Sequence, residues 1–225
     1  MCAYIPLYRG SNDFSVYRAF EDKCNQIVND VSEDYSNLTE SFLAGENAVK
    51  QNAFQGEVDF IVTSPPYLNG TNYFRNTKIE LWLSGYIKHE SELGKFTQEA
   101  LIAGINNVSK ASRVSKTYPF VEAVASKLDE VAYDKRIPSL VRGYCSDTEL
   151  WVSNCLNLMK LNSRLVIDIG DSRFAGVHVP TDDFIIEIAT QLGLKHIHTE
   201  MVRERHSKDG SKLKQVLLVF EKVGG

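Results

Sequence analysis

Residues 58–67 constrain the fold of this chain more than any other stretch, because an apolar run ends there in two prolines. Residues 58–62 are mostly β-branched or aromatic and apolar at nearly every position, which predicts a strand covered on both faces of a parallel sheet. Pro65 and Pro66 lack an amide hydrogen and fix φ, so the strand ends before them. Open α/β sheets bind ligands at the carboxyl ends of their strands, which makes the residues around these prolines a candidate binding site.

The loop after this strand carries groups that suit a planar amine. The Ser64 hydroxyl and the Pro65 carbonyl can both accept hydrogen bonds, and the prolines fix the angle between them. The exocyclic amine of a nucleobase can donate to both oxygens while the Tyr67 ring stacks on the base. The alternative interpretation is a plain Pro-Pro turn after a strand, with no function of its own.

Residues 63–67, which read Thr-Ser-Pro-Pro-Tyr, resemble the catalytic motif of the S-adenosylmethionine-dependent amino-methyltransferases, (Asp/Asn/Ser)-Pro-Pro-(Tyr/Phe/Trp). Serine in the first place is similar to the DNA cytosine-N4 branch, as are residues 68–82, 170–172 and 176–181. The resemblance implies methyl transfer from S-adenosylmethionine to the N4 amine of a cytosine rotated out of DNA. The residues that it assigns to catalysis are Ser64, Pro65, Pro66 and Tyr67.

A second element of this family is expected upstream of the strand, where the chain reads Gly-Glu-Asn-Ala over residues 45–48. Residues 41–44 predict a brief strand before it, and a glycine at a strand end permits close approach of a ligand. The family has Gly-Asp-Ala or Gly-Asp-Cys here, beside the adenine of the cofactor, so the match is approximate. The alternative is a helix cap after a turn. The cofactor contacts that the resemblance implies are Gly45, Glu46, Asn47 and Thr63.

The glycine-rich turn of the family, Phe-x-Gly-x-Gly or similar, does not occur in this sequence. The resemblance therefore covers the catalytic half of a Rossmann-like class I methyltransferase fold, an α/β chain of about five strands with a C-terminal antiparallel hairpin and a helical insertion. It implies that a second polypeptide carries the glycine-rich turn and target recognition. A half-sheet exposes an edge strand and an apolar flank, so we expect an interface at the strand near residue 60, a helix over 13–31 and the arm 1–10.

The pattern divides the chain into three parts. Residues 1–87 hold the N-terminal helix and the catalytic loop, residues 88–142 are expected to form a helical insertion over the active-site face, and residues 143–225 hold the rest of the methyltransferase domain. Apolar periodicity and capping residues predict helices over 74–87, 90–107, 119–132, 146–160 and 183–192, and strands over 165–170, 196–202 and 215–223. Ser146 or Asp147 is the expected cap of the helix over 146–160. The apolar residues of the first of these helices are expected to face inward.

Polar and basic residues beyond the strand ends are candidate DNA contacts. Those just past the loop can line a base pocket or meet a phosphate, and the basic tip of the hairpin can contact the DNA backbone or be a solvated loop. Asp171 can bond the flipped base, orient a neighbouring residue, or be a turn residue without function. The full set is Asn69, Asn72, Arg75, Asp171, Arg173, Arg203, Arg205 and Lys208.

Composition narrows the classes of protein. The net charge of −4 excludes a globally basic nucleic-acid-binding protein, so DNA binding needs a local basic patch. The 4 cysteines show no Cys-x-x-Cys pairing, which favours a reduced, cytoplasmic chain without a zinc site. Cys145 and Cys155 fall in one helical stretch and are expected in the core. No apolar run is long enough to span a membrane, and the histidines show no metal spacing.

The sequence leaves other functions open. The same loop serves other planar amines, so methylation of adenine N6 or of an RNA guanine N2 is the first alternative. A protein-glutamine methyltransferase more often has Asn in place of Ser64. From a different class, the chain can be a non-catalytic DNA-binding or scaffold subunit, which the missing glycine-rich turn favours and the intact Ser-Pro-Pro-Tyr opposes.

Overall fold

The computed structural model of the chain describes residues 15–32, 40–45, 47–50, 54, 56–68, 73–108, 118–207 and 209–224. The chain divides into two compact units, Met1–Leu43 and Ala44–Gly225. In the first unit, α1 (Val16–Ser32) confirms the helix expected over 13–31, and none of its residues is buried. The arm 1–10 lies outside the described residues.

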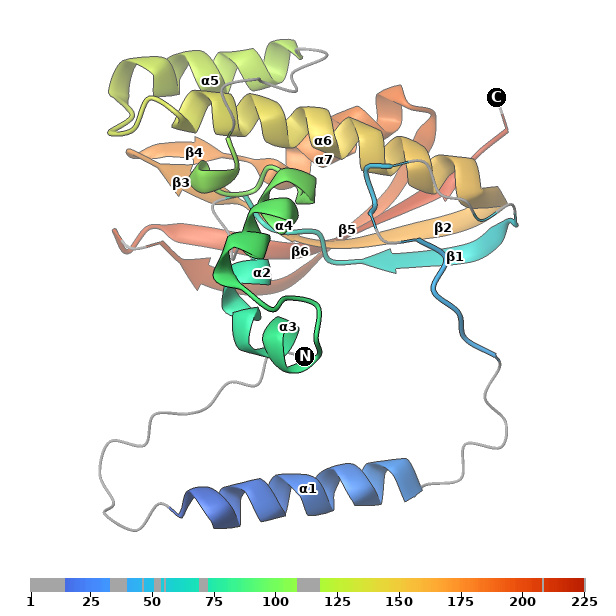
Figure 1. The fold of residues 1–225 in the computed structure, drawn as a ribbon. Coiled ribbons are helices and arrows are strands. Elements are labelled where there is room, and N and C mark those ends of the chain that lie inside the picture. Colours follow the sequence, from blue (N-terminus) through green and yellow to red (C-terminus); the bar gives the residue numbers. More distant parts are fainter. Residues whose placement is uncertain are drawn as a thin grey trace. The chain divides into compact units, whose positions relative to one another are not determined.

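A mixed four-stranded sheet forms the centre of the second unit, in the order β1-β2-β6-β5 (Figure 1). β1 (Val58–Thr63) and β2 (Met159–Gly170) run parallel, as expected for the strands near 60 and 167. β5 (Leu194–His206) and β6 (Lys212–Lys222) form the expected antiparallel hairpin, and β6 also pairs antiparallel with β2. The α/β class and the C-terminal hairpin are thereby confirmed.

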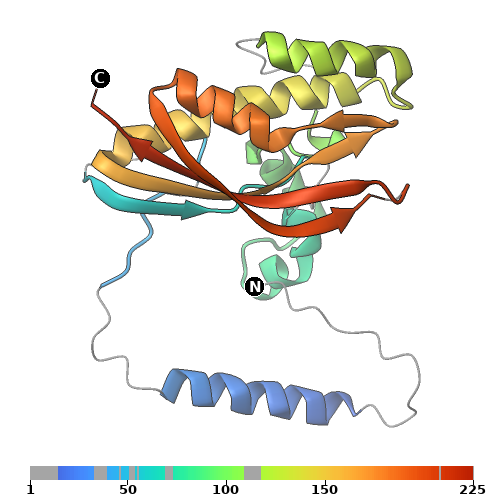
Figure 2. The same cartoon turned by 180° about the vertical axis from the view of Figure 1, so that it is seen from behind.

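Two helices, α6 (Ile137–Leu158) and α7 (Thr181–Gln191), cover one face of this sheet (Figure 2). Because side chains alternate along a strand, every second residue of the two central strands points into this layer. Fully buried side chains on this face include Leu165, Ile167, Ile169, Val216, Leu218 and Phe220. Burial of each such side chain stabilises the fold by roughly 1.5–3 kcal/mol, so this layer forms a main part of the core.

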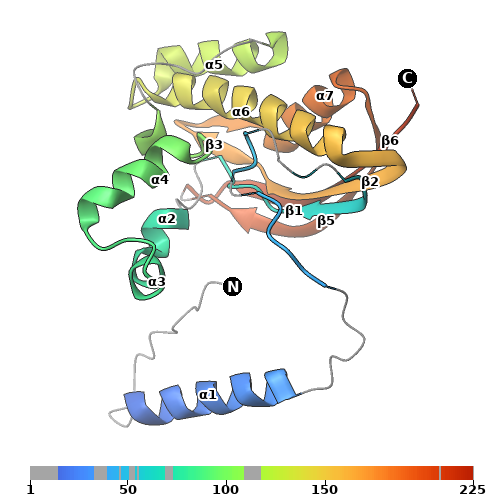
Figure 3. The same cartoon turned by 45° about the vertical axis from the view of Figure 1, so that its right-hand side comes forward.

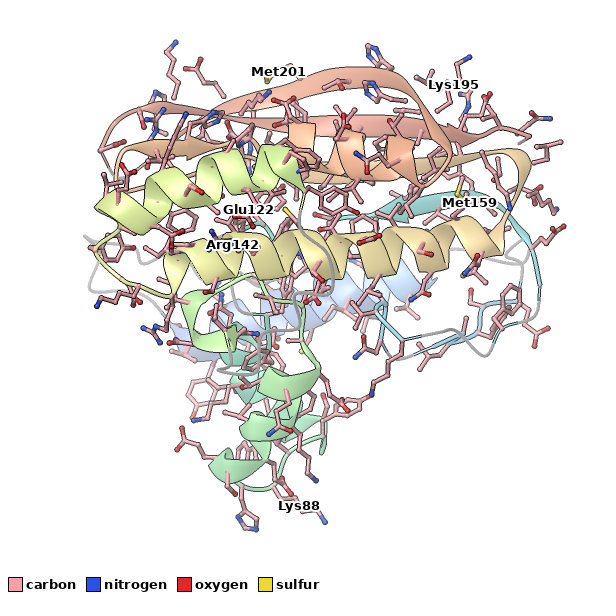
Figure 4. All side chains as sticks on the ribbon, turned by 90° about the horizontal axis from the view of Figure 1, so that it is seen from above. Lys88, Glu122, Arg142, Met159, Lys195 and Met201 are labelled. Carbon is pink, nitrogen blue, oxygen red and sulfur yellow. The ribbon has the colours of Figure 1, made fainter. Side chains whose placement is uncertain are left out.

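A second helical layer lies outside the first. α5 (Pro119–Val131) packs on the outer side of α6, away from the sheet, and confirms the helix expected over 119–132 (Figure 1). Arg142 of α6 donates to a carboxylate oxygen of Glu122 at 2.9 Å and pairs with Asp129 at 2.9 Å (Figure 4). These hydrogen bonds raise the pKa of Arg142, so the two helices are joined by a permanent charge as well as by apolar contacts.

The opposite face of the sheet is open at β1. Phe60 and Val62 expose 55% and 70% of their surfaces, so the expectation of a strand covered on both faces is wrong for this chain by itself. α2 (Tyr73–Asn76) and α3 (Lys78–Leu83) lie on this side of the sheet, opposite α6 and α7 (Figures 1 and 3). The two central strands, β2 and β6, are therefore packed on one side by α6 and α7, whereas β1 exposes apolar side chains on the other side.

The expected inward-facing helix over 74–87 is also corrected. A break at Thr77 separates α2 from α3. Three of the side chains expected to face inward, Ile79, Trp82 and Leu83, expose 69%, 60% and 73% of their surfaces. The apolar stripe is real, but within the described part of this unit no layer lies against it on this side of the sheet.

α6 begins earlier than the expected start at residue 146, because Pro138 suits the first turn of a helix and the apolar pattern continues through residue 145. Asp147, expected as part of the N-cap, is buried inside the helix and accepts a hydrogen bond from the Ile102 amide at 2.8 Å. Gly143 allows this close approach, since a Cβ there would lie 2.9 Å from Ile102 Cδ1.

The remaining elements are short. Residues 41–44 form no strand, and the helix expected over 90–107 is reduced to one α-helix between two 3₁₀ turns.

Cys145 and Cys155 both lie in α6, and burial raises the pKa of each thiol. The described part of the chain contains no helix that is long and apolar enough to cross a membrane. The short elements are η1 (Glu90–Glu92), α4 (Leu93–Glu99), η2 (Ile105–Asn107), β3 (Ser172–Phe174) and β4 (Val177–Val179).

Candidate active site

The Pro-Pro loop leaves the sheet at the carboxyl end of β1, where Thr63 pairs with Ile167 of β2. Pro65 is buried and anchors the loop, whereas Ser64 is exposed and Tyr67 is half-buried. The prolines hold the backbone extended, so the serine and the tyrosine are presented on a stiff corner. A planar ligand can therefore reach the loop from solvent.

The segment after β2 lies beside this loop, as expected for neighbouring parallel strands. The Ser172 hydroxyl donates a hydrogen bond to the carbonyl oxygen of Leu68, which directly follows the loop and is buried. The ends of β1 and β2 are thus joined by a buried contact between residues that are far apart in the sequence.

The Tyr67 hydroxyl is anchored to a half-buried carboxylate of the sheet. It donates to Asp168 Oδ1 at 3.0 Å, and Asp168 lies on β2 two residues before the strand ends. Burial, this hydrogen bond and the negative charge of Asp168 raise the pKa of Tyr67 to about 12, against smaller lowering effects of Arg205 and a hydrogen bond with Ser64. Tyr67 is therefore a neutral phenol at every physiological pH.

Asp168 is itself held by the hairpin. Gln215 of β6, which is buried, donates to both carboxylate oxygens of Asp168 at 2.7 and 2.9 Å. Arg203 of β5 donates through Nε to the Gln215 side-chain oxygen at 2.7 Å. A continuous hydrogen-bonded chain thus runs from the exposed surface of β5 to the Tyr67 hydroxyl.

Asp168 and Gln215 were not among the residues predicted for the site. The sequence carries one signal for Asp168, because an acid within the apolar run of residues 165–169 has to find a partner. No comparable signal marks Gln215.

Arg205 lies over the ring of Tyr67, with its guanidinium carbon 5.2 Å from the ring centroid. Its terminal nitrogen donates to the carbonyl oxygen of Asp171 at 2.8 Å and lies 3.4 Å from that of Lys214. Gly170 leaves the necessary space, because a Cβ there would lie 2.3 Å from this nitrogen and 3.1 Å from the Tyr67 ring. Arg205 is therefore packed into the site rather than extended into solvent.

Asp171 is buried and makes protein contacts with both carboxylate oxygens. Oδ1 accepts from the Lys214 amide at 2.8 Å and lies 3.8 Å from the Arg205 guanidinium. Oδ2 lies 2.6 Å from His178 Nε2. Of the three roles weighed for this residue, orientation of its neighbours is the one that these contacts favour.

The residues expected around the cofactor are only partly brought together. Thr63 ends β1 beside the loop, and Gly45 is exposed. The side chain of Asn47 accepts from the Val49 amide at 3.0 Å, as in a turn, and donates to the carbonyl of Glu99, far away in the sequence, at 3.0 Å. Glu46 lies outside the described residues.

The expected DNA contacts are distributed around the site. Asn69, Asn72 and Lys208 lie outside the described residues, and Arg75 belongs to α2. Arg173 donates to the Gly176 carbonyl at 2.7 Å, and Arg203 is exposed. Among the described residues, the arginines of β5 are thus the ones tied most directly to the Pro-Pro loop.

The arrangement presents an exposed hydroxyl, a backbone carbonyl and an anchored aromatic ring at one corner. It offers hydrogen-bond acceptors and a stacking surface to a planar amine. The described part of the chain has no group of three or more His, Cys, Asp and Glu residues placed to hold a metal ion.

No family model matches the chain. The chain is 26% identical to the Type II methyltransferase M.AvaI of Nostoc sp. in an alignment 148 residues long, which covers 60% of this chain and 30% of that protein. It is 23% identical over 222 residues to the Type II methyltransferase M.BsoBI of Geobacillus stearothermophilus, covering 87% of this chain and 41% of that protein. The chain thus spans less than half the length of these relatives.

Solved structures overlap with the chain only in part. A protein of Thermus thermophilus assigned as a DNA modification methylase superposes with a TM-score of 0.37 and 14% identity, covering 77% of this chain and 50% of that one. The same protein complexed with S-adenosyl-L-methionine gives a TM-score of 0.30 and 20% identity over 38% of this chain and 40% of that one. These overlaps are too small to carry an argument about function. It is the sequence that relates this chain to Type II DNA methyltransferases, over part of their length.

Proposed function

We propose that this chain is the base-binding half of an S-adenosylmethionine-dependent DNA methyltransferase that methylates the N4 amine of a flipped cytosine. The observation that carries the proposal is the corner at the carboxyl end of β1, where an exposed Ser64 and a half-buried Tyr67 flank the buried Pro65. The sequence relation to Type II methyltransferases supports DNA as the substrate. Serine in the first place of the motif supports cytosine over adenine.

In this proposal the chain acts on the amine by position. A cytosine that leaves the duplex costs a few kcal/mol of lost stacking, and stacking on the Tyr67 ring returns part of this. The Ser64 hydroxyl and the Pro65 carbonyl accept the two N4 hydrogens, which draws the amine toward tetrahedral geometry and directs its lone pair away from the loop. Tyr67 stays neutral because its pKa is raised, so it orients the base without exchanging a proton.

The test of this role is the Ser64→Ala variant. Loss of one acceptor for the amine should lower kcat by about tenfold to a hundredfold, equivalent to roughly 1.5–3 kcal/mol, with little change in DNA affinity. Steady-state methylation with tritiated S-adenosylmethionine measures kcat, and a gel-shift assay measures DNA binding. An unchanged kcat would contradict the assignment of Ser64, whereas lost DNA binding would give it a different role.

We further propose that S-adenosylmethionine is held by a complementary half on a second polypeptide. That half would carry the glycine-rich turn, and the donor would supply the electrophilic methyl group. The supporting observation is the open face of the sheet, where Phe60 and Val62 of β1 and Trp82 of α3 expose 55%, 70% and 60% of their surfaces. β1 is also an edge strand of the described sheet, so its outer side can pair with another strand. A half-fold with its own strands and helices fits both features, and the length of the relatives outside the matched region leaves room for it.

A single charge on the open face tests this interface. Val62→Glu buries an unpaired carboxylate in the complex, which typically costs roughly 3–5 kcal/mol and should weaken association by more than a hundredfold. Val131→Glu, at a 53% exposed valine of α5 in the outer helical layer, is the matched control and should associate as the wild type does. Association is measured by calorimetry with the polypeptide that carries the Phe-x-Gly-x-Gly turn. Equal association of both variants, or submicromolar binding of S-adenosylmethionine to this chain alone, would contradict the divided site.

A further inference from the structure

We propose that Arg205 is a positioning residue that clamps the ring of Tyr67, and that the β5–β6 hairpin thereby sets the orientation in which the ring meets the target base. The inference rests on the proposed function for its meaning in catalysis. Its structural part, that the hairpin holds the ring, is independent of that function.

The guanidinium of Arg205 has the contacts of a built-in component. It lies 5.2 Å from the ring centroid of Tyr67, donates to the Asp171 carbonyl at 2.8 Å, and exposes only 26% of the side chain. A planar cation at this distance is attracted by the electrons of the ring face, and the attraction grows when water is excluded. The interaction therefore fixes one face of the ring.

Gly170 shows that the space is made for this contact. Any side chain at position 170 would meet the Arg205 terminal nitrogen at 2.3 Å and its central carbon at 2.8 Å. The same added Cβ would lie 3.1 Å from the Tyr67 ring, so glycine serves both partners at once. The carboxyl end of β2 is thus shaped so that the Arg205 guanidinium and the Tyr67 ring can pack together.

A second contact holds the hydroxyl end of the Tyr67 side chain. The Tyr67 hydroxyl donates to Asp168, which Gln215 holds, and Arg203 holds Gln215. Arg203 and Arg205 both belong to β5, whereas Gln215 lies on β6. The ring face and the hydroxyl are therefore both tied to one hairpin, and a movement of the hairpin changes the orientation of the ring.

The contacts favour an arginine that stays against the Tyr67 ring when the base binds (a clamp) over one that only occupies the place of the base and has to leave (a plug). An arginine that only fills the place of an absent base would have to leave when the base arrives, and its departure would break the hydrogen bond to the Asp171 carbonyl and the packing against Gly170. A clamp keeps these contacts and leaves the base to stack on the ring face that Arg205 does not occupy. The two models predict opposite effects of removing the arginine on the rate of methylation: a clamp predicts a slower reaction and a plug a faster one.

The ring itself can be observed in the chain alone. With tyrosines labelled with ¹³C in the ring, the Tyr67 signal is identified by its loss in Tyr67→Phe. We expect Arg205→Met to shift this signal, because the change removes the guanidinium from the ring. Gly170→Ala should also shift it, because the added Cβ would lie 2.3 Å from the Arg205 terminal nitrogen and 3.1 Å from the ring itself. Arg205→Lys should return part of the shift, and Lys195→Met, at an exposed lysine on the other end of β5, should cause none. A Tyr67 signal that is unchanged in folded Arg205→Met would overturn the clamp.

Kinetics of the complex with the complementary half separate the clamp from its alternatives. Arg205→Met should lower kcat by about tenfold or more while KM for DNA changes less than about twofold, as expected for a lost orientation. A faster reaction would indicate a plug, and a raised KM with unchanged kcat would indicate a phosphate contact; either result would overturn the inference. If the complex methylates no DNA at all, the proposed function fails, and the labelled chain still decides whether Arg205 holds the ring.

Discussion

At the scale of the residue, Tyr67 meets two requirements with one side chain. Its ring has to be reachable by a base, and its hydroxyl has to be fixed so that the ring keeps its angle. The structure satisfies the second with Asp168 and leaves the ring half-buried. Ser64 and Pro65 meet the same two requirements with two residues. The buried proline fixes the loop, and the exposed serine is open to a ligand.

The raised pKa of Tyr67 predicts a specific dependence of stability on pH. Because the folded state holds the pKa at about 12 against an ordinary 10.0, the neutral phenol is favoured by folding. This contribution is fully present below pH 10 and is lost as the pH rises toward 12. The difference in unfolding free energy between the wild type and Tyr67→Phe should therefore be constant from about pH 6 to 9 and should fall above pH 10.

Urea denaturation at a series of pH values measures that difference. The Phe variant keeps the ring and removes only the ionisable group, so the effect of all other tyrosines cancels. A difference that stays constant as the pH rises from 10 to 12 would show that the hydroxyl is not held by Asp168.

The sequence predicts those residues of the site that belong to a contiguous motif, and it misses those that distant strands bring together. The Ser-Pro-Pro-Tyr loop is contiguous and was predicted as a unit. Asp168 lies 101 residues from Tyr67, and Gln215 lies 47 residues from Asp168, so their meeting depends on which strands are neighbours and on their register. Periodicity predicts that a strand exists, but not which residue stands opposite in another strand.

At the scale of the element, most strands and helices with strong local signals were predicted, whereas the strand over 41–44 and the helices over 74–87, 90–107 and 146–160 had to be corrected. β1, β2 and the hairpin follow from apolar runs and turn residues. The start of α6 was missed because Ser146 and Asp147 look like a cap, whereas the tertiary structure uses Asp147 as a buried acceptor for the Ile102 amide at 2.8 Å. The apolar face of α3 was read as inward-facing because a sequence shows that a stripe exists and not what covers it.

The buried role of Asp147 can be measured. Asp147→Ala leaves the Ile102 amide without its acceptor in the interior, which should lower the unfolding free energy by roughly 1–3 kcal/mol. Asp59→Ala removes an ion pair with Lys160 in which the aspartate side chain is 82% exposed, and it should cost less than about 1 kcal/mol. Urea denaturation of the two variants compares them directly, and equal costs would contradict a buried structural role for Asp147.

At the scale of the whole molecule, the chain has the features of one half of a larger sheet. One face of the sheet is packed by α6 and α7, and the other exposes Phe60 and Val62 at the edge strand β1. The candidate site residues lie at the carboxyl end of β1, and the sequence contains no Phe-x-Gly-x-Gly turn. The proposed division between a half that orients the amine and a half that holds the methyl donor would account for both observations.

The product of the reaction tests this account most directly. DNA is incubated with this chain, the polypeptide that carries the Phe-x-Gly-x-Gly turn, and S-adenosylmethionine with a deuterated methyl group, then digested to nucleosides for mass spectrometry. We predict labelled N4-methylcytosine that requires both polypeptides and is strongly reduced by Ser64→Ala. Label in N6-methyladenine, label that survives Ser64→Ala at the wild-type level, or no labelled nucleoside at all would contradict it.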